Sequence, residues 1–501
     1  MNPVLRRAVT ATATSAASVT ATTGQGFFRG SQRLSSTLSG TSNSRLAATS
    51  TASPSESSPP KKGFASLSQP SQPTGPSAGQ VDVRLVSRLT RPVSPTRAQK
   101  HRPLAQSVPE SAVLSERNSV LTLDFGGKAS SFDSVWLRDH CRCPVCFHTE
   151  TKQRLVDTFE IPLDIQISSA TLSQNGKSIE ITFQNDNHKS VFDLDWLRSN
   201  SYNPRVATKS EDVGRTFKLW GSEITKSIPV VDFDKVMAGD EGLAEWLNLI
   251  DKFGIAFVQG VPPTPEATEA LGCRISFIRE THYGKFWDFT ANNAHADTAY
   301  TGLALQSHTD TTYFTDPIGL QLFHITEFTG VGGKSVYVDG FNAAAELKRT
   351  YPEYYKLLTE VPVPTHSAGD PKVVIAPSPR AYPILNIDPL TKQLYQVRWN
   401  NDDRSVLNSK TLKRLGSDEP VSVKDFYAAL KAWVSILRDP KYETWIQLEP
   451  GLAVIVDNWR VLHGRSAFTG HRRVCGSYHG YDDYRSRVRD LCYGRLGRLD
   501  I

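Results

Sequence analysis

The uneven distribution of aromatic residues most constrains what this chain can fold into. All 9 Trp and all 16 Tyr lie beyond residue 105, whereas the residues before it are dominated by Ser, Thr, Ala, Pro and Gly. A segment of that composition cannot bury enough apolar surface to offset the conformational entropy that folding removes. The globular part of the chain is therefore expected after residue 110, where enough sequence remains for two folded units.

The low-complexity start divides into two parts. The first 50 residues carry five arginines but no Asp or Glu, and the first acidic residue is Glu56. An acid-free start rich in Arg, Ser and Thr predicts a mitochondrial transit peptide over residues 1–45, and hence the matrix; the alternative is a tail that merely lacks acids. Pro-Ser and Pro-Pro pairs in residues 46–110 predict a disordered linker.

Composition argues against two classes of partner. The net charge of +6 is modest, and no basic run with interleaved aromatic residues stands out in the globular part, so nucleic-acid binding has little support. No apolar run approaches the roughly 20 residues that span a bilayer, which predicts a chain without a membrane span.

Hydrophobic periodicity predicts the elements of two units. A first unit, residues 111–205, has alternating apolar residues at 119–125 and 177–183, which predict strands. A second unit, residues 206–501, has helical patterns at 242–253 and 423–437 and strand patterns at 228–233, 255–258, 319–324, 334–338, 373–375, 394–399, 451–456 and 474–478. Strands with a few covering helices predict a barrel-like β core. No phosphate-binding glycine loop and no internal repeat is apparent.

Three residues of the second unit have the chemistry of an iron site. His308 and Asp310 are two residues apart, so in an extended segment their side chains share one face. His463 is the best candidate for a third ligand, because it follows the apolar strand pattern at 451–456. Two histidines and one carboxylate form the facial triad of non-haem Fe(II) oxygenases, which leaves coordination positions open.

A cation near this triad would suit 2-oxoglutarate, whose far carboxylate needs a positive partner. Arg472 lies nine residues beyond His463, and its guanidinium could grip a carboxylate with two hydrogen bonds. The adjacent Arg473 is an alternative partner. Arg465 is a second nearby cation, although a structural ion pair would explain it equally well, and Ser335 could add a hydroxyl donor.

The first unit contains a cysteine cluster. Cys141, Cys143 and Cys146 lie within six residues, while the other three cysteines are scattered, a pattern that favours a metal in a reducing compartment over disulfides. A closed tetrahedral zinc site needs a fourth donor, for which His140 and His148 are close in sequence.

Longer segments resemble a known family. Residues 308–314 (HTDTTYF) and 457–465 (DNWRVLHGR) resemble the trimethyllysine dioxygenases, which with the γ-butyrobetaine dioxygenases are the carnitine-pathway oxygenases of the taurine-dioxygenase-like group. Residues 274–284 (RISFIRETHYG) match the segment that precedes the family's substrate cage. The resemblance covers roughly residues 115–490.

This resemblance implies a fold and a set of cofactors. The fold is mainly β with helices: a double-stranded β-helix, or jelly roll, preceded by a small zinc-binding β domain that supports homodimers. The metal is Fe(II) on the triad, with ascorbate as its reductant. 2-Oxoglutarate binds Arg472, assisted by Arg465 and by Ser335, where members usually carry Thr. For the zinc site, the resemblance favours His188 as the fourth ligand.

The reaction that the resemblance implies is hydroxylation of N6,N6,N6-trimethyl-L-lysine at C3. It is coupled to oxidative decarboxylation of 2-oxoglutarate to succinate and CO2 and is the first step of carnitine biosynthesis. A quaternary ammonium group donates no hydrogen bond, so aromatic faces recognise it. Spacing alone favours core aromatic residues, but the match to the family's cage positions assigns this role to Tyr283 and Trp287, one turn apart if helical, and to Tyr300 and Tyr478.

The amino-acid end of the substrate needs polar partners. Asp297 resembles an acid that would bind the α-ammonium group, although a solvated loop acid is the alternative reading. Asn400 and Asn401 resemble a family segment that contacts this end, and the sequence does not distinguish between them.

Three alternative functions remain. A γ-butyrobetaine dioxygenase, which makes carnitine, shares the iron and the cage but does not need Asp297. A non-catalytic reader of methylated lysine needs the cage but neither iron nor Arg472. A zinc-dependent interaction module would explain the first unit alone and would leave the oxygenase motifs unused.

Overall fold

The computed structural model describes residues 111–493, apart from residues 116, 207–214, 216, 291–300 and 372. The predicted transit peptide and linker therefore lie outside the described residues. Among the helices of the described part, none is long and apolar enough to cross a membrane.

The N-terminal unit is built from two similar halves. The first consists of strands β1 (Ser111–Leu114), β2 (Val120–Asp124) and β3 (Ala129–Asp133), followed by helix α1 (Ser134–Asp139). The second consists of strands β6 (Ile167–Leu172), β7 (Ser178–Phe183) and β8 (Lys189–Asp193), followed by helix α2 (Leu194–Ser199). A short hairpin, β4 (Phe147–His148) and β5 (Gln153–Arg154), lies between them in the chain.

Both halves carry the pattern Phe-Asp-x-x-Trp-Leu-Arg, at residues 132–138 and 192–198. Each pattern begins at the end of a strand and runs into the helix, and Trp136 stacks on Trp196 with ring centroids 5.6 Å apart. The expectation of no internal repeat was wrong. The two copies, β1–β3 with α1 and β6–β8 with α2, differ in the loops between their strands, so the repeat becomes apparent only when the strands are compared.

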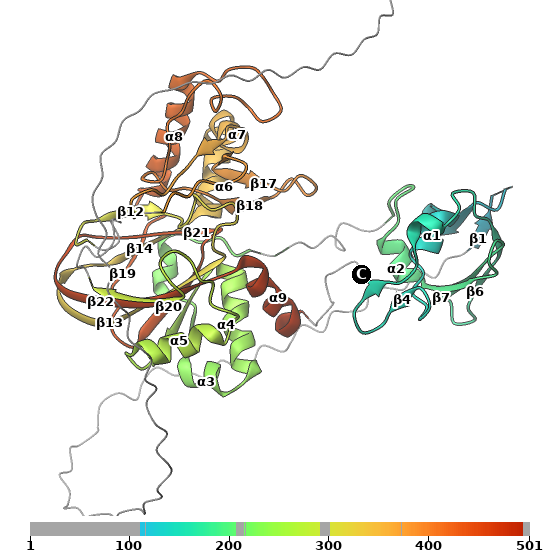
Figure 1. Cartoon of the computed structure of the whole chain (residues 1–501), viewed down its shortest axis with the longest axis horizontal. Coiled ribbons are helices and arrows are strands. Elements are labelled where there is room, and N and C mark those ends of the chain that lie inside the picture. The colour runs from blue at the N-terminus through green and yellow to red at the C-terminus, as the bar shows by residue number, and fades with distance from the viewer. Residues whose placement is uncertain are drawn as a thin grey trace, which may run out of the picture. The chain divides into compact units, whose positions relative to one another are not determined.

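Two antiparallel sheets form the core of the second unit (Figure 1). The larger has the order β11 (Phe286–Thr290), β22 (Phe468–His479), β13 (Leu320–Gly332), β20 (Leu452–Asp457), β10 (Ile255–Gln259) and β9 (Val230–Asp232), with β9 parallel to β10. The smaller has the order β12 (Leu305–His308), β21 (Val461–Arg465), β14 (Ser335–Asp339) and β19 (Thr444–Ile446). Apolar side chains of both sheets share one buried cluster, so the sheets pack face to face.

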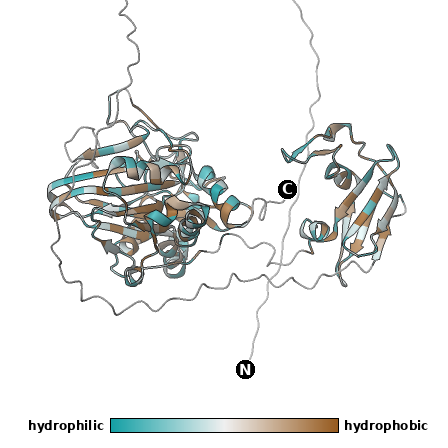
Figure 2. Ribbon diagram, turned by 90° about the horizontal axis from the view of Figure 1, so that it is seen from below, coloured by the Kyte–Doolittle hydropathy of each residue, from teal (hydrophilic) through white to brown (hydrophobic). Residues whose placement is uncertain are grey.

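Helices cover the outer faces of both sheets. The helices that pack against the larger sheet are α4 (Asp240–Phe253), α5 (Pro265–Cys273) and α9 (Tyr481–Cys492). The short helix α3 (Phe233–Ala238) comes directly before α4 in the chain. Against the smaller sheet pack α6 (Gly340–Thr350), α7 (Pro352–Glu360) and α8 (Val423–Leu437). Figure 2 shows apolar residues running along the strands that these helices cover. The short pairs β15 (Val363–Pro364) with β16 (Ala381–Tyr382) and β17 (Leu385–Ile387) with β18 (Leu394–Val397) complete the unit.

Local signals explain why these segments fold as they do. Helix α8 begins where Ser422 accepts a hydrogen bond from the Asp425 N–H, and its buried residues follow a helical period. Helix α4 ends at Gly254, whose φ of 73° is left-handed. The predicted mainly β fold with helices is confirmed, and two facing sheets agree with a jelly roll. The strand expected at 373–375 was wrong, since only one isolated bridge joins Ile375 to Ser367.

Candidate active site

The three predicted iron ligands converge at the edge of the smaller sheet. His308 ends β12 and is paired directly with His463 on β21, so the β-ladder sets the separation of the two imidazoles. Asp310 follows β12, and its carboxylate lies 3.1 Å from His308 Nε2 and 3.7 Å from His463 Nε2. The structure thus brings the predicted residues together, and His463, expected only to follow the strand at 451–456, lies within the next strand, β21.

The donor set fits a divalent metal. One ligand atom from each residue lies within 4.8 Å of the others, and the Nδ1 of His308 bonds to the Gln306 carbonyl at 2.7 Å, which leaves its Nε2 to face Asp310. Burial opposes a charge on His308, but the adjacent carboxylate outweighs it and raises the His308 pKa. Burial lowers the His463 pKa to about 4, so this imidazole is neutral at pH 7, whereas His308 would release its proton when a metal binds.

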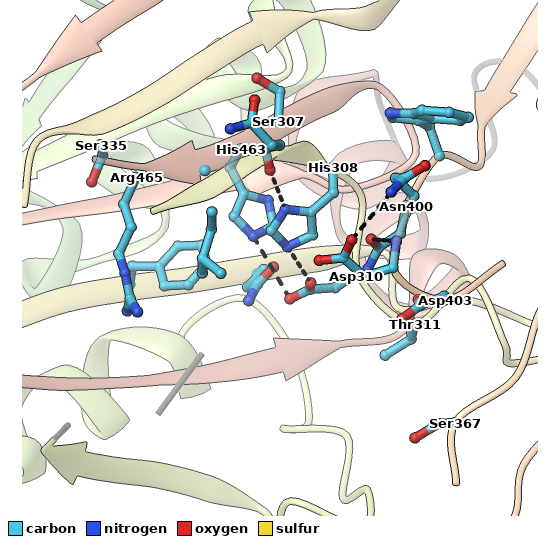
Figure 3. Close-up of a pocket in the computed structure, with 18 of the residues that line it drawn as sticks. Ser307, His308, Asp310, Thr311, Ser335, Ser367, Asn400, Asp403, His463 and Arg465 are labelled. Carbon is cyan, nitrogen blue, oxygen red and sulfur yellow. Dashed lines mark hydrogen bonds and ion pairs between the residues drawn. The ribbon is translucent and has the colours of Figure 1, made fainter. Parts of the chain in front are cut away.

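These residues lie in the wall of a cavity of about 540 Å³ between the two sheets. Figure 3 shows the two imidazoles and Asp310 in the middle, with Ser335 and Arg465 on one side and Asn400 and Asp403 on the other. The metal-binding set therefore separates a basic end of the cavity from a polar end.

At the basic end, the structure distinguishes Arg472 from Arg473. Successive side chains on β22 point to opposite faces. Arg472 faces the cavity, is 9% exposed and makes no ion pair with any residue that the structure describes. Burial and the charge of Arg465 lower its pKa to about 10, so it remains charged at pH 7. Arg473 faces outward and pairs with Asp288 at 2.6 Å and Glu327 at 3.0 Å.

Ser335 and Arg465 are paired across β14 and β21, so both belong to the same end of the cavity. The Arg465 guanidinium donates to the carbonyl groups of Thr301 and Leu303, so part of its donor capacity is used to hold that loop. Tyr337, which the sequence did not single out, pairs with His463 across the same strands and lines the cavity.

Aromatic side chains form another part of the wall. Trp287 lies 6.1 Å from Tyr478 and 5.6 Å from Phe323, measured between ring centroids, and the Tyr283 hydroxyl lies 3.1 Å from that of Tyr313. The expected helical spacing of Tyr283 and Trp287 was wrong, because Trp287 belongs to strand β11. All five rings line the cavity, including Phe323 and Tyr313, which the sequence did not assign to the site.

Two features place this aromatic wall beside the metal-binding set. The Tyr478 hydroxyl lies 3.5 Å from the Asp310 carboxylate, and the Phe323 ring lies 5.1 Å from the His463 ring. Gly476 makes room for the indole of Trp287, since a Cβ there would lie 2.4 Å from a Trp287 ring carbon. The predicted residues Asp297 and Tyr300 lie outside the described residues.

At the polar end, Asn400 and Asn401 both line the cavity. The Asn401 amide bonds to Asp402 and Arg404. The Asn400 oxygen accepts from the Asp402 N–H, whereas its NH2 group has no hydrogen-bond partner in the described part of the chain. Of the two amides, Asn400 therefore has more donors available to a ligand.

The cysteine cluster of the N-terminal unit also converges. The Sγ atoms of Cys141, Cys143 and Cys146 lie 3.2, 3.6 and 3.5 Å from His188 Nε2. In a tetrahedral site with Zn–S of about 2.3 Å and Zn–N of about 2.0 Å, sulfur and nitrogen donors lie about 3.5 Å apart. The donor set therefore fits zinc, and it links the segment between α1 and β4, which carries the cysteines, to the β7–β8 hairpin of the second half.

Neighbouring contacts also favour His188 over His140 and His148 as the fourth ligand of the cysteine cluster. Arg138 donates to the Cys146 sulfur at 3.2 Å and pairs with Asp186, which in turn accepts from the His188 N–H. His140 instead stacks on Trp136 and bonds to its carbonyl, and the Nδ1 of His148 bonds to the Thr151 N–H.

The chain matches two families. Residues 211–478 match the family described as Taurine catabolism dioxygenase TauD, TfdA, and residues 112–198 match Gamma-butyrobetaine hydroxylase-like, N-terminal. Both matches agree with the resemblance seen in the sequence motifs.

Curated relatives agree with these matches. The "Trimethyllysine dioxygenase" of Meyerozyma guilliermondii is 41% identical over 75% of this chain and 94% of its own length. The "Trimethyllysine dioxygenase, mitochondrial" of Rattus norvegicus is 40% identical over 74% of this chain and 85% of its own. The "Gamma-butyrobetaine dioxygenase" of Homo sapiens is 30% identical over 77% of this chain and 98% of its own. The predicted class of enzyme is confirmed: the chain belongs to the TauD, TfdA family of dioxygenases, with the trimethyllysine dioxygenases among its relatives.

Proposed function

We propose that this enzyme hydroxylates N6,N6,N6-trimethyl-L-lysine at C3, coupled to oxidative decarboxylation of 2-oxoglutarate to succinate and CO2, as the first step of carnitine biosynthesis. The observation that carries the proposal is one cavity in which the His308, Asp310 and His463 set lies between the buried cation Arg472 and an aromatic wall. A reader of methylated lysine needs only the aromatic wall.

Fe(II) is the metal that we assign to this set; when bound, it supplies the redox chemistry with O2 that inserts one oxygen atom into a C–H bond. Arg472 binds the far carboxylate of 2-oxoglutarate, and Ser335 and Arg465 border the same end. The low-dielectric surroundings of Arg472 strengthen this pairing. Ascorbate keeps the iron reduced between turnovers.

The aromatic wall binds the trimethylammonium group. Tyr283, Trp287 and Tyr478 offer ring faces to a cation that cannot donate a hydrogen bond. Asn400 donates to the amino-acid end, and we assign Asp297 to the α-ammonium group and Tyr300 to the cage. Holding the substrate at both ends presents one C–H bond to the metal centre, which is the protein's main contribution to rate and selectivity.

The deciding experiment supplies anaerobically iron-loaded protein with 2-oxoglutarate and either trimethyllysine or γ-butyrobetaine, then admits oxygen. We expect succinate release and the gain of one oxygen atom by trimethyllysine, followed by mass spectrometry. A gain by γ-butyrobetaine alone would assign the chain to carnitine formation. The γ-butyrobetaine alternative has specific support in the match of residues 112–198, although the identity to that human relative is lower.

We also propose a mitochondrial matrix location, on the acid-free start and the names of the mammalian relatives, a homodimer, and structural zinc on Cys141, Cys143, Cys146 and His188. A closed site with four protein ligands has no position for catalysis, so zinc stabilises the N-terminal unit.

Replacing Cys143 with serine tests the zinc site. We expect Cys143→Ser to lose its zinc and to lower markedly the free energy of unfolding of the N-terminal unit, because the binding free energy of structural zinc contributes to folding. Zinc content by elemental mass spectrometry and calorimetric unfolding measure both effects. The control is Cys273→Ser, which alters an exposed thiol outside the cluster. Equal zinc in both variants would contradict the assignment.

A further inference from the structure

The three residues of the metal-binding set are not held in the same way. His308 and His463 are opposite each other in a β-ladder, which fixes their backbones. Asp310 lies beyond the end of β12, and the next residue, Thr311, has φ of 54°. A β-branched residue in the left-handed region is strained and keeps that conformation only where its surroundings enforce it. Something outside the ladder must therefore hold Asp310.

Asn458 makes those contacts. Its side-chain oxygen accepts from the Asp310 N–H at 2.7 Å, and its NH2 group donates to the Asp310 carbonyl at 3.0 Å and to the Ile318 carbonyl at 3.1 Å. The residue is 1% exposed, so water does not compete for these bonds. The Asn458 amide thus holds both the N–H and the carbonyl group of Asp310, and it closes the loop from Thr311 to Ile318.

We propose that Asn458 is a positioning residue for the metal centre, which aims the Asp310 carboxylate at the point that the two histidines face. The proposal rests on the metal-ligand role of Asp310 given above. Asn458 precedes His463 by five residues and lies in the turn between β20 and β21. The turn that leads into the strand of His463 therefore also holds Asp310, which lies in no strand.

The turn itself does not depend on Asn458. Arg460 pairs with Asp339 at 2.8 Å, both side chains being fully buried. The Trp459 indole donates to the Pro317 carbonyl and stacks on Tyr481 with ring centroids 3.8 Å apart. Because these contacts brace the turn on their own, removing the Asn458 amide should release Asp310 more than it disturbs the fold.

The test measures Mn(II) binding to metal-depleted full-length protein by electron paramagnetic resonance. We expect Asn458→Ala to weaken Mn(II) binding by about 10- to 100-fold, the loss typical of removing a residue that orients a ligand. At saturating Co(II), its visible spectrum should differ from that of the parent, since one donor is no longer fixed.

The matched control is Asn386→Ala. Asn386 is also a buried asparagine whose NH2 group donates to a carbonyl, that of Pro383 at 3.1 Å, but it does not line the cavity. It should leave Mn(II) affinity and the Co(II) spectrum unchanged. Parent-like Mn(II) binding by Asn458→Ala, or an equal loss in both variants, would overturn the proposal.

Two further variants keep the outcomes separable. Asp310→Ala should reduce Mn(II) binding at least as much as Asn458→Ala; if neither variant has any effect, the assigned metal site itself is wrong. Should Asn458→Ala fail to fold, Asn458→Asp keeps the side-chain shape and the acceptor for the Asp310 N–H. Weakened Mn(II) binding in that folded variant supports the clamp, and parent affinity counts against it.

Discussion

Replacing Arg472 with alanine is expected to raise the KM for 2-oxoglutarate by about 100-fold, equivalent to about 3 kcal/mol. The reason is that Arg472 is a buried cation that faces the cavity and lacks an ion-pair partner among the described residues. Because burial has already removed most of the water around Arg472, a carboxylate bound there forms its ion pair at a smaller desolvation cost. Succinate release at varied 2-oxoglutarate concentration measures the effect.

Arg473→Ala is the matched control for this change. Arg473 is the next residue on β22, carries the same charge and points outward to Asp288 and Glu327. Surface ion pairs contribute little, at most about 1 kcal/mol, so the KM for 2-oxoglutarate should stay within about twofold. If Arg465→Ala raised this KM while Arg472→Ala did not, Arg465 would be the cosubstrate's partner instead.

Elements with strong local signals could be predicted from the sequence. Helix α8 has its predicted bounds because a capping serine and a long apolar period agree there. Strand β22 runs from Phe468 to His479, much further than the predicted 474–478, because its first half is polar and is held by pairing with β13. Pairing between distant strands leaves no local signal.

The site residues also differ in whether the sequence carries a local signal for them. Motif residues such as His308 and Asp310 could be found because their spacing carries the chemistry. Gln321, Phe323 and Tyr337 could not, because what puts them in the cavity is strand register, which a sequence does not show. Gln321 is a buried amide in the cavity wall, yet in sequence it is an ordinary strand residue.

Replacing His463 with alanine is expected to lower kcat by more than about 100-fold and to weaken Mn(II) binding at least as strongly, because it removes a donor rather than a neighbour of one. The same change should cost little stability in the metal-free protein. His463 Nδ1 has no hydrogen-bond partner among the described residues, and its ring faces the cavity. Activity assays, metal titration and thermal unfolding of the metal-free form measure these effects.

His324→Ala should behave in the opposite way, which makes it the matched control. Burial lowers the pKa of His324 to about 4, as it does for His463. His324, however, bonds to the Thr268 hydroxyl at 2.7 Å and accepts from the Gly451 N–H at 3.1 Å, and it does not line the cavity. Its loss leaves buried polar groups without partners, at a cost of about 1 to 3 kcal/mol in unfolding free energy, while metal affinity should remain. If both variants lost stability and metal affinity together, neither loss could be assigned to coordination, and the role of His463 as a ligand would lose its support.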